Sequence, residues 1–377
     1  MRVLHLFANW KWTGPAEPAL NLAWTQRKRG HEVHFACGRQ VDPMPNFVAN
    51  EARSRSIAPI LSLRLGKHRH PLYDPIDRRA LRALVTDLRP EIVHCHLPND
   101  HRLALGATRG LGIPVVRSLY DGDPPRNDRD TRTQFAHPTR ALIVLSERMR
   151  ESVAGRFPID ASRVHVVDGA VDLARFDPRR KGLPRLDREY GLEAGDFVVG
   201  IVARMQKHRR FDIFFEAVTK TAAVLPNLKV LLVGRGTWMD EVAVKPAGRK
   251  ELVGKVIFTG YRQGSEYVAT LRCMSTKVYL TPGSDGSCRA VREALAMGLP
   301  IVAARRGHLQ ELIEDGTNGI LVDDDADQLS DALVRLAKDT RQRKRMSDAA
   351  FSIARDRYGL VRQAEAVDAI YASALAE

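Results

Sequence analysis

Short apolar runs alternate with helical stretches along this chain of 377 residues, and the alternation occurs twice. A short apolar run bounded by turn residues is typical of a buried parallel strand, and an amphipathic stretch between two such runs is typical of a crossover helix. The alternation therefore predicts an α/β protein in which parallel sheets carry helices on both faces. The length of the chain favours two domains.

The expected strands fall into two groups. Those of the first half are Val3–Phe7, Val33–Ala36, Ile92–His96, Val115–Leu119, Ala141–Ser146 and Val164–Val167. Those of the second half are Phe197–Arg204, Leu228–Gly234, Val256–Gly260, Lys277–Leu280, Ile301–Ala304 and Ile320–Val322. Helices are expected between them, for example over Pro15–Arg29, Asp212–Ala223 and Asp327–Ala337, and a last helix over Leu360–Leu375.

A polar segment rich in Pro, Gly and Arg, Asp177–Arg185, lies between the two groups of strands and is typical of a linker. We therefore expect two doubly wound domains in tandem, with residues 1–178 in the first and residues 179–357 in the second. In such folds the ligand lies at the carboxyl ends of the strands, so the loops that follow the strands are the ones to search for a site.

The chain is strongly basic, with a formal net charge of +14 and a pI near 9.9. Nucleic acid, an anionic membrane surface or a phosphate-rich ligand would each explain this charge. The sequence has no recognition-helix motif, zinc-ligand spacing or interleaved aromatic residues, so we expect no nucleic-acid partner.

The spacing of the cysteines and the hydropathy of the chain indicate the cellular compartment in which the protein is found. Cys37, Cys95, Cys273 and Cys288 show no CxxC spacing, which favours reduced cysteines over a disulfide framework or a zinc site. No secretory signal precedes the first strand, and no apolar run approaches the roughly 20 residues that span a bilayer. We expect a cytoplasmic protein that can also lie peripherally on the inner face of the cytoplasmic membrane.

The stretch Thr281–Pro300 carries the clearest chemical signal. A strand leads into a turn that contains Asp285, and a helix that contains Glu293 follows. The free backbone N–H groups at such a junction and the positive end of the helix form a seat for phosphate. The backbone N–H groups of Gly286, Ser287 and Cys288 would bind the phosphate.

Two acidic residues separated by seven others resemble the signature of the retaining family 4 glycosyltransferases, which have the GT-B fold. Further segments resemble the pattern of this family: Val171–Phe176, Gly200–Asp212, Thr259–Arg262, Gly307–Leu312 and Asp315–Val322. The resemblance implies two Rossmann-like domains that face each other across a cleft. It also implies that the C-terminal helix, residues 358–377, packs back on the first domain.

The resemblance also implies roles for residues of the donor side. Arg204 and Arg209 would stabilise a leaving diphosphate, with Lys207 as the alternative cation, and Asp285 stands where the family usually has Glu. Glu293 would hold the ribose hydroxyls. Glycines or backbone that approach the donor are expected at Gly14, Gly234 and Tyr261, and amides at Gly286, Ser287 and Cys288. For Glu293 an alternative is a salt bridge along the helix.

On the acceptor side, three residues follow strands of the first half. His94 and His96 point the same way from one strand, and His96 is expected to line the site, although the nearby His101 also raises the possibility of a metal site. Many family members have a histidine that contacts the sugar where this chain has Tyr120, so Tyr120 or Asp121 is expected to replace it.

The expected activity is therefore transfer of a sugar from a UDP-, GDP- or ADP-linked donor, with retention and without a metal or other cofactor. The acceptor would be a saccharide or a lipid-linked one, such as lipopolysaccharide core, in cell-envelope synthesis. The run Ile57–His70, which is both apolar and basic, would contact an anionic membrane. Two other hypotheses are a nucleotide-sugar epimerase on the same scaffold and a basic nucleic-acid-binding protein.

Overall fold

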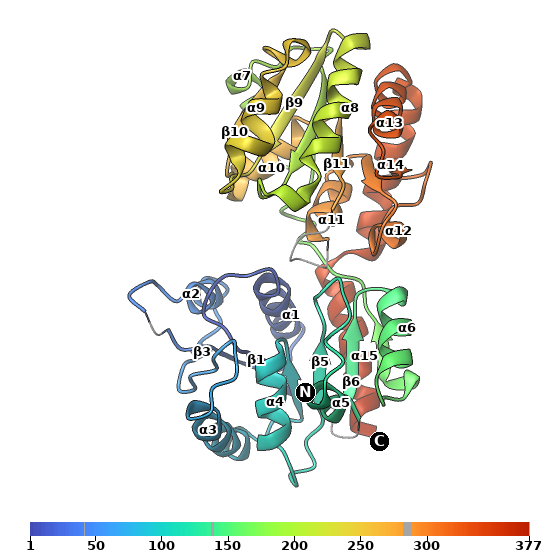
Figure 1. Cartoon of the computed structure of the whole chain (residues 1–377). Helices are drawn as coiled ribbons and strands as arrows, with labels where there is room; N and C mark the ends of the chain where they lie inside the picture. Colours follow the sequence, from blue (N-terminus) through green and yellow to red (C-terminus); the bar gives the residue numbers. More distant parts are fainter. Residues whose placement is uncertain (41, 137–138, 282–287, 377) are drawn as a thin grey trace. The chain divides into compact units, whose positions relative to one another are not determined.

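The computed structural model describes residues 1–40, 42–136, 139–281 and 288–376. The chain forms two compact units (Figure 1). Unit 1 consists of Met1–Ala170 and the C-terminal helix, and unit 2 begins at Val171 and ends at Gly359. The chain thus enters unit 2 ahead of the segment Asp177–Arg185.

Unit 1 is built on a parallel sheet of seven strands in the order β3-β2-β1-β4-β5-β6-β7. Its strands are β1 (Arg2–Phe7), β2 (Glu32–Cys37), β3 (Pro59–Ile60), β4 (Ile92–Cys95), β5 (Val115–Ser118), β6 (Thr139–Val144) and β7 (Val164–Val166). The strand order reverses between β1 and β4, which pair directly. A reversal of this kind leaves a crevice at the carboxyl ends of the two strands.

Helices cover both faces of this sheet (Figure 1). They are α1 (Ala16–Lys28), α2 (Phe47–Ser54), α3 (Tyr73–Leu88), α4 (Pro98–Ala107), α5 (Arg129–Ala136), α6 (Glu147–Arg156) and α15 (Leu360–Ala376), with a short turn, η1 (Ala161–Arg163). Val3 of β1 belongs to a core cluster with Leu22 of α1 and with α15, and Leu4 belongs to a second cluster with other residues of α1 and with α2, α3 and α4. Successive residues of a strand point to opposite faces, which explains the split.

Unit 2 repeats the plan with six parallel strands in the order β10-β9-β8-β11-β12-β13. They are β8 (Phe197–Val202), β9 (Leu228–Val233), β10 (Val256–Gly260), β11 (Thr276–Tyr279), β12 (Ile301–Ala304) and β13 (Gly319–Val322). Here the order reverses between β8 and β11. The reversal again places a crevice at the carboxyl ends of two neighbouring strands.

The helices of unit 2 also form two layers. They are α7 (Leu186–Glu189), α8 (Phe211–Val224), α9 (Lys245–Ala247), α10 (Gly264–Arg272), α11 (Arg289–Ala296), α12 (Leu309–Leu312), α13 (Ala326–Lys338) and α14 (Thr340–Arg357), with the short turns η2 (Lys207–Arg209), η3 (Asp240–Val244) and η4 (Lys250–Leu252). One core joins α8 and α13 to the sheet, and the other joins α10, α11 and α14 to the opposite face.

The two parallel α/β sheets confirm the predicted fold class. Most of the predicted strands differ from the observed ones by one or two residues at an end. The sequence analysis missed β3, which is only two residues long and contains Pro59. Proline has no N–H for the sheet ladder, so strands that contain it lie at sheet edges, as β3 does.

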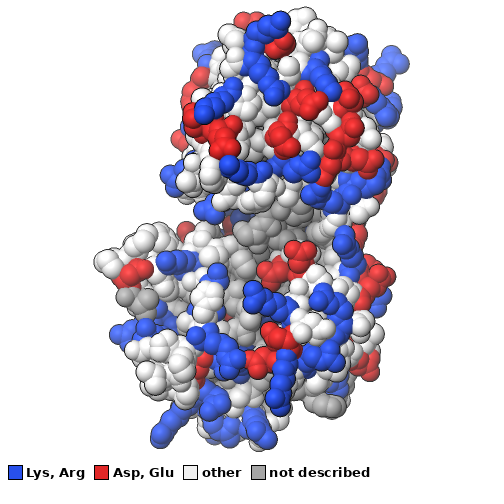
Figure 2. Space-filling view, viewed as in Figure 1, with Lys and Arg blue, Asp and Glu red and all other residues white. Residues whose placement is uncertain are grey.

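Figure 2 shows Lys and Arg side chains interspersed with Asp and Glu on the face drawn. That face therefore has no single basic stripe of the kind that follows a nucleic-acid backbone. The apolar residues of the run Ile57–His70 do not form a surface either, because Ile57, Leu63 and Leu65 are buried in the core of unit 1. Among the described residues, no helix combines the length and the apolar character needed to cross a bilayer.

Candidate functional site

The strand reversal of unit 2 brings together the loop after β8 and the end of β11. Arg209, in η2, donates a hydrogen bond from Nη1 to the carbonyl oxygen of Thr281 at 3.1 Å. Its Nε is buried, as is Oγ1 of Thr281, and neither atom has a hydrogen-bond partner in the part of the chain that the structure describes. A buried polar group without a partner is costly, so this corner offers unused donors to a ligand.

The other two cations of the loop are arranged differently. Arg204 is exposed and forms no ion pair or hydrogen bond with the described residues. Lys207 pairs with Glu241 at 2.9 Å, and its ammonium lies 4.0 Å from the centre of the Trp238 ring. The geometry therefore favours Arg209 over Lys207 as the cation that faces the strand reversal.

Arg210, the residue after η2, has a φ of 57°. This left-handed backbone conformation suits glycine and is strained for other residues. Arg210 adopts it as the residue that precedes α8, and its Nη1 pairs with Asp324 at 2.6 Å. The loop thus keeps the glycine geometry with an arginine.

Gly234 and Gly236 follow β9 and hold its end against the loop after β8. A Cβ on Gly234 would lie 2.1 Å from the carbonyl oxygen of Ala203, and one on Gly236 would lie 2.3 Å from that of Met205. Gly234 also has a φ of 137°. What these glycines approach in the structure is protein backbone, so they shape the loop that carries Arg204 and Arg209.

Glu293 is buried in α11 and is held by several polar groups. Tyr267 donates its hydroxyl to Oε2 of Glu293 at 2.8 Å, and Nε of Arg289 lies 3.4 Å from Oε1. The fully buried Lys277 donates to the carbonyl oxygen of Ala290, and burial lowers the pKa of its ammonium to about 8, against the attraction of Glu293. The helix salt bridge considered for Glu293 is present and holds Oε1, while the Tyr267 hydroxyl holds Oε2.

The remaining donor-side residues lie at the same edge of the sheet or beyond the described residues. Cys288 is fully buried and has a φ of 48° immediately before α11. Asp285, Gly286 and Ser287 lie outside the described residues. Tyr261 follows β10, is 58% exposed, and has the guanidinium of Arg235 5.1 Å from its ring centre.

The predicted acceptor-side residues separate into buried and exposed groups at the carboxyl edge of unit 1. His96 is fully buried, and Tyr120 is 7% exposed; Nδ1 of His96 and the Tyr120 hydroxyl lie 2.8 Å apart. Asp121, the next residue, is exposed. Gly14 is half-buried in the turn that leads into α1. His96 and Tyr120, which were predicted separately, are therefore in direct contact, with His96 in the core.

His5, His94 and His96 form a fully buried cluster, and one ring nitrogen from each lies within 4.8 Å of the others. Such a triangle is compatible with a metal ion, but all six ring nitrogens already contact protein groups. Partners of the three rings are Gln26, Ser118, Tyr120, Tyr371 and one another. His101 lies apart from the cluster and contacts Oγ1 of Thr139 at 2.8 Å. The geometry is that of a hydrogen-bonded network.

A second buried polar pair lies at the same edge. The carboxylate of Asp100 accepts N–H groups of Ala8 and Leu97, and burial raises its pKa to about 7. Arg117, on β5, is fully buried, and its Nη1 has no hydrogen-bond partner among the described residues. Burial lowers the pKa of Arg117, although attraction from Asp100 opposes this. The two charges stabilise each other behind the end of β1.

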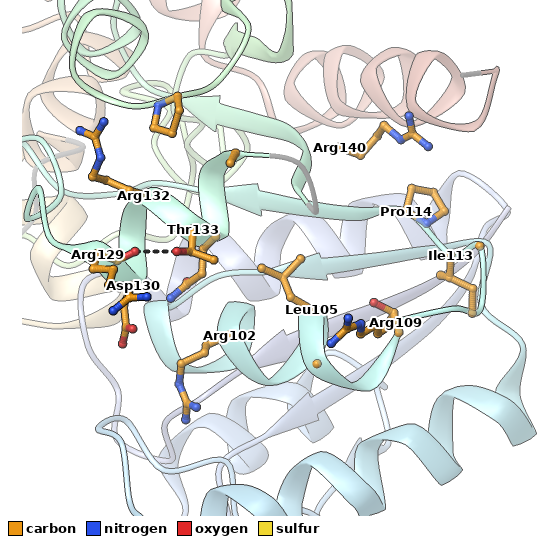
Figure 3. Close-up of a pocket in the computed structure, with 16 residues that line it drawn as sticks. Arg102, Leu105, Arg109, Ile113, Pro114, Arg129, Asp130, Arg132, Thr133 and Arg140 are labelled. Atoms are coloured by element: carbon orange, nitrogen blue, oxygen red, sulfur yellow. Dashed lines mark hydrogen bonds between the residues drawn. The ribbon is translucent and has the colours of Figure 1, made fainter.

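A cavity of ≈ 1340 Å³ lies between α4 and α5, and none of the predicted site residues lines it (Figure 3). Five arginines line it: Arg102, Arg109, Arg129, Arg132 and Arg140. Figure 3 shows the side chains of Arg102 and Arg132 pointing in opposite directions. Arg102 pairs with Asp74, and Arg132 donates to Asn127. These arginines do not converge on one anion.

Sequence reasoning missed several of these residues. Lys277 was visible as a charged residue inside an apolar strand, and His5 alternates with apolar residues in β1 as His94 does in β4. Both signals indicate a polar group that points into a core. Tyr267 and Gln26 carry no such signal, because they lie on helices with mixed composition.

Comparison with known proteins agrees with this arrangement. Residues 14–175 match the family described as Glycosyltransferase Family 4, and residues 196–339 match the family described as Glycosyl transferases group 1. The chain belongs to the family 4 glycosyltransferases. This family 4 chain has the GT-B architecture of two Rossmann-like units.

Relatives of this family 4 chain are remote in sequence. A D-inositol 3-phosphate glycosyltransferase of Nocardioides is 26% identical over 292 residues, which cover 70% of the chain and 63% of the relative. A phosphatidyl-myo-inositol mannosyltransferase of Mycolicibacterium smegmatis is 25% identical over 342 residues, which cover 88% of the chain and 82% of the relative.

Solved structures match almost the whole chain. A glycosyltransferase of Rickettsia africae has a TM-score of 0.84 at 14% identity, covering 99% of this chain and 98% of that one. HepE of Anabaena, in complex with UDP, has a TM-score of 0.81 at 19% identity, covering 99% and 100%. At these identities the likeness supports the fold of this family 4 chain.

Proposed function

We propose that this chain transfers a sugar from a nucleotide-sugar donor to a saccharide or lipid-linked acceptor, with retention at the anomeric carbon. The observation that carries the proposal is Arg209, whose buried Nε has no described partner at the reversal between β8 and β11. Ligands of open α/β sheets bind at such reversals. A guanidinium at this place suits a diphosphate, because it can donate two parallel hydrogen bonds to phosphate oxygens.

In this proposal unit 2 binds the donor. Departure of the nucleoside diphosphate builds negative charge on its oxygens, and Arg209 and Arg204 stabilise that charge. Glu293 holds the ribose hydroxyls, since Tyr267 and Arg289 already fix the orientation of its carboxylate. The leaving phosphate takes the acceptor proton, so that no protein base and no metal ion are needed.

UDP-linked sugars are the first donors to test, because HepE of Anabaena binds UDP and UDP-glucose. A thermal-shift screen with UDP, GDP and ADP, each with and without its sugar, measures binding, since a ligand of the folded state raises the melting temperature. We expect one nucleotide to raise it in the presence of EDTA. If none of them does so with or without divalent metal, donor binding is refuted.

Transfer is tested separately from binding. The selected donor is incubated with and without candidate saccharides and lipid-linked saccharides, and released nucleotide and product are quantified. Product that contains both the sugar and the acceptor is expected, with the anomeric configuration of the donor. A change of the sugar in the absence of acceptor would instead identify an epimerase.

The acceptor is proposed to be presented at an anionic membrane. Leu72 and Ile76 are 72% and 63% exposed at the start of α3, and basic residues Lys67, Arg69 and Arg79 lie close to them in sequence. Exposed apolar side chains among basic ones favour binding to an anionic leaflet. This surface replaces the run Ile57–His70, in which Ile57, Leu63 and Leu65 are buried.

Sedimentation with vesicles tests this surface. The wild-type chain is expected to sediment with anionic vesicles and to remain in solution with neutral ones. The double variant L72S/I76S is expected to lose most of this binding. V253S, which changes an equally exposed apolar residue of unit 2, serves as the matched control. Equal binding of all three chains would refute a role for this surface.

A further inference from the structure

A line of five buried or nearly buried polar side chains crosses unit 1. The Tyr120 hydroxyl lies 2.8 Å from Nδ1 of His96, and Nε2 of His96 lies 3.0 Å from Nδ1 of His5. Nε2 of His5 lies 2.9 Å from Oε1 of Gln26, and Nε2 of Gln26 lies 2.7 Å from Oδ1 of Asp368. We call these five residues the Tyr120–Asp368 chain.

The direction of every hydrogen bond in this chain is set at the Asp368 end. Asp368 pairs with Arg29 at 3.1 Å, and an ionised carboxylate only accepts hydrogen bonds. Gln26 must therefore turn its NH₂ group toward Asp368 and its carbonyl oxygen toward His5. This argument assigns the two ends of the Gln26 amide from chemistry, which coordinates without hydrogens do not do.

The two histidines then have one tautomer each. Burial lowers the pKa of His5 to about 4 and that of His96 well below its ordinary value, so both rings are neutral. His5 carries its proton on Nε2, because Gln26 offers it only an oxygen, and its Nδ1 is an acceptor. His96 must donate from Nε2 to that acceptor, which leaves its own Nδ1 as an acceptor.

Tyr120 stands at the other end, two residues after β5. Because Nδ1 of His96 is an acceptor, the Tyr120 hydroxyl must donate its proton to it. The oxygen of Tyr120 then has only lone pairs left, so it can accept a hydrogen bond but cannot donate one. A histidine at this position would instead offer a ring nitrogen in either tautomer.

We propose that Asp368 is a positioning residue, which acts through Gln26, His5 and His96 to make Tyr120 a pure hydrogen-bond acceptor for a hydroxyl group of the substrate. The nature of the substrate, a sugar, rests on the proposed function. The polarity of the Tyr120–Asp368 chain does not rest on it. Specificity at the carboxyl edge of unit 1 is thus set by a carboxylate on the C-terminal helix.

The polarity is tested by NMR on the full chain with ¹⁵N-labelled histidine. Long-range ¹H–¹⁵N correlations distinguish a protonated ring nitrogen from an unprotonated one, and single-histidine substitutions assign the signals. At pH 7, His5 and His96 are expected to be neutral and protonated on Nε2. Protonation of either ring on Nδ1, or of both nitrogens, would overturn the proposal.

Two variants on α15 test the role of Asp368. D368N offers Gln26 an amide in place of the carboxylate, so Gln26 can turn and His5 and His96 are expected to populate the Nδ1-protonated tautomer. E365Q is the matched control, because Glu365 pairs with the same Arg29 but does not contact Gln26. Its tautomers are expected to match those of the wild type. Wild-type tautomers in D368N would also overturn the proposal.

Tyr120 is tested with the donor and acceptor found by the screens above. Y120F removes the acceptor oxygen and is expected to raise KM for the sugar substrate about 10-fold, with little change in kcat. For the deoxy analogue that lacks the recognised hydroxyl, wild type and Y120F are expected to have equal KM. An unchanged KM for the natural substrate would refute recognition by Tyr120. Failure to find a donor would refute the proposed function and leave the NMR result unaffected.

Discussion

Arg209 reaches from the loop after β8 to the carbonyl oxygen of Thr281, which follows β11, at 3.1 Å. This hydrogen bond joins the segments that follow the two strands at which the sheet of unit 2 reverses its order. It uses one nitrogen of the guanidinium and leaves the buried Nε without a described partner. The guanidinium is therefore held in place while some of its hydrogen-bond donors remain unused. A phosphate-binding residue needs this arrangement.

Replacement of Arg209 by alanine is expected to weaken nucleotide-diphosphate binding about 10- to 100-fold, because charge-assisted hydrogen bonds to phosphate are lost. The melting temperature without ligand should change little, since Arg209 is only half-buried. Isothermal calorimetry with the selected nucleotide measures the effect. K207A is the control, because Lys207 is engaged by Glu241 and Trp238. A larger loss in K207A than in R209A would reverse our assignment.

Replacement of Glu293 by glutamine is expected to lower the free energy of unfolding by about 1–3 kcal/mol. The change removes the carboxylate that accepts from Tyr267 and that favours the buried ammonium of Lys277. Chemical denaturation measures the loss, and nucleoside binding should weaken as well. E266Q removes a carboxylate from an exposed helix pair with Arg262. It should lower the free energy of unfolding by less than about 0.5 kcal/mol. Equal losses would contradict the assignment.

Gly234 and Gly254 both have positive φ, 137° and 74°, but only Gly234 is crowded by other backbone. Alanine at position 254 meets nothing within 4 Å, so G254A should cost only about 1 kcal/mol of backbone strain. G234A should cost roughly 3 kcal/mol or more, because its Cβ would displace the carbonyl of Ala203. Urea denaturation of both variants measures the difference. Equal losses of unfolding free energy in G234A and G254A would mean that the loop after β8 shifts to make room for the Cβ at position 234.

Acid is expected to destabilise unit 1 between pH 6.5 and pH 4. Burial lowers the pKa of His5 to about 4 and those of His94, His96 and His101 well below 6.5, so their contribution is complete above pH 6.5 and is lost as the pH falls. His5 alone accounts for about 3 kcal/mol at pH 4. Asp100, whose pKa is raised to about 7, acts in the opposite direction, but the histidines outnumber it.

Calorimetry from pH 7 to pH 4 tests this expectation. The melting temperature should fall with pH, and the fall should persist in high salt, because salt screens surface repulsion but not buried groups. A constant melting temperature, or a fall that salt abolishes, would mean that the buried histidines do not govern acid stability.

The sequence could predict the architecture because periodicity and turn residues are local signals. The boundaries of β10 and β12, for example, were predicted to the residue. The edge strand β3 could not be predicted, because two residues that include a proline carry no strand pattern.

The candidate site was less predictable. Residues just after strands, such as Arg209 and Tyr120, could be found from their place in the pattern. The contacts of Glu293 could not, because Tyr267 comes from a different helix and Lys277 from a strand, and no local rule brings three such elements together. Likewise Asp368 lies far from His96 in the chain, and only the packing of α15 on unit 1 connects them.

The positive φ of Arg210 has a consequence for ligand capture. A glycine in this conformation would leave the loop free to sample other shapes before binding, whereas the arginine is anchored to Asp324, beyond β13. The loop after the central strand β8 is thereby tied to the loop after the edge strand β13. Because the loop after β8 is already ordered, less conformational entropy of the loop is lost when an anion binds. The cost is a small backbone strain at Arg210 in the protein without ligand.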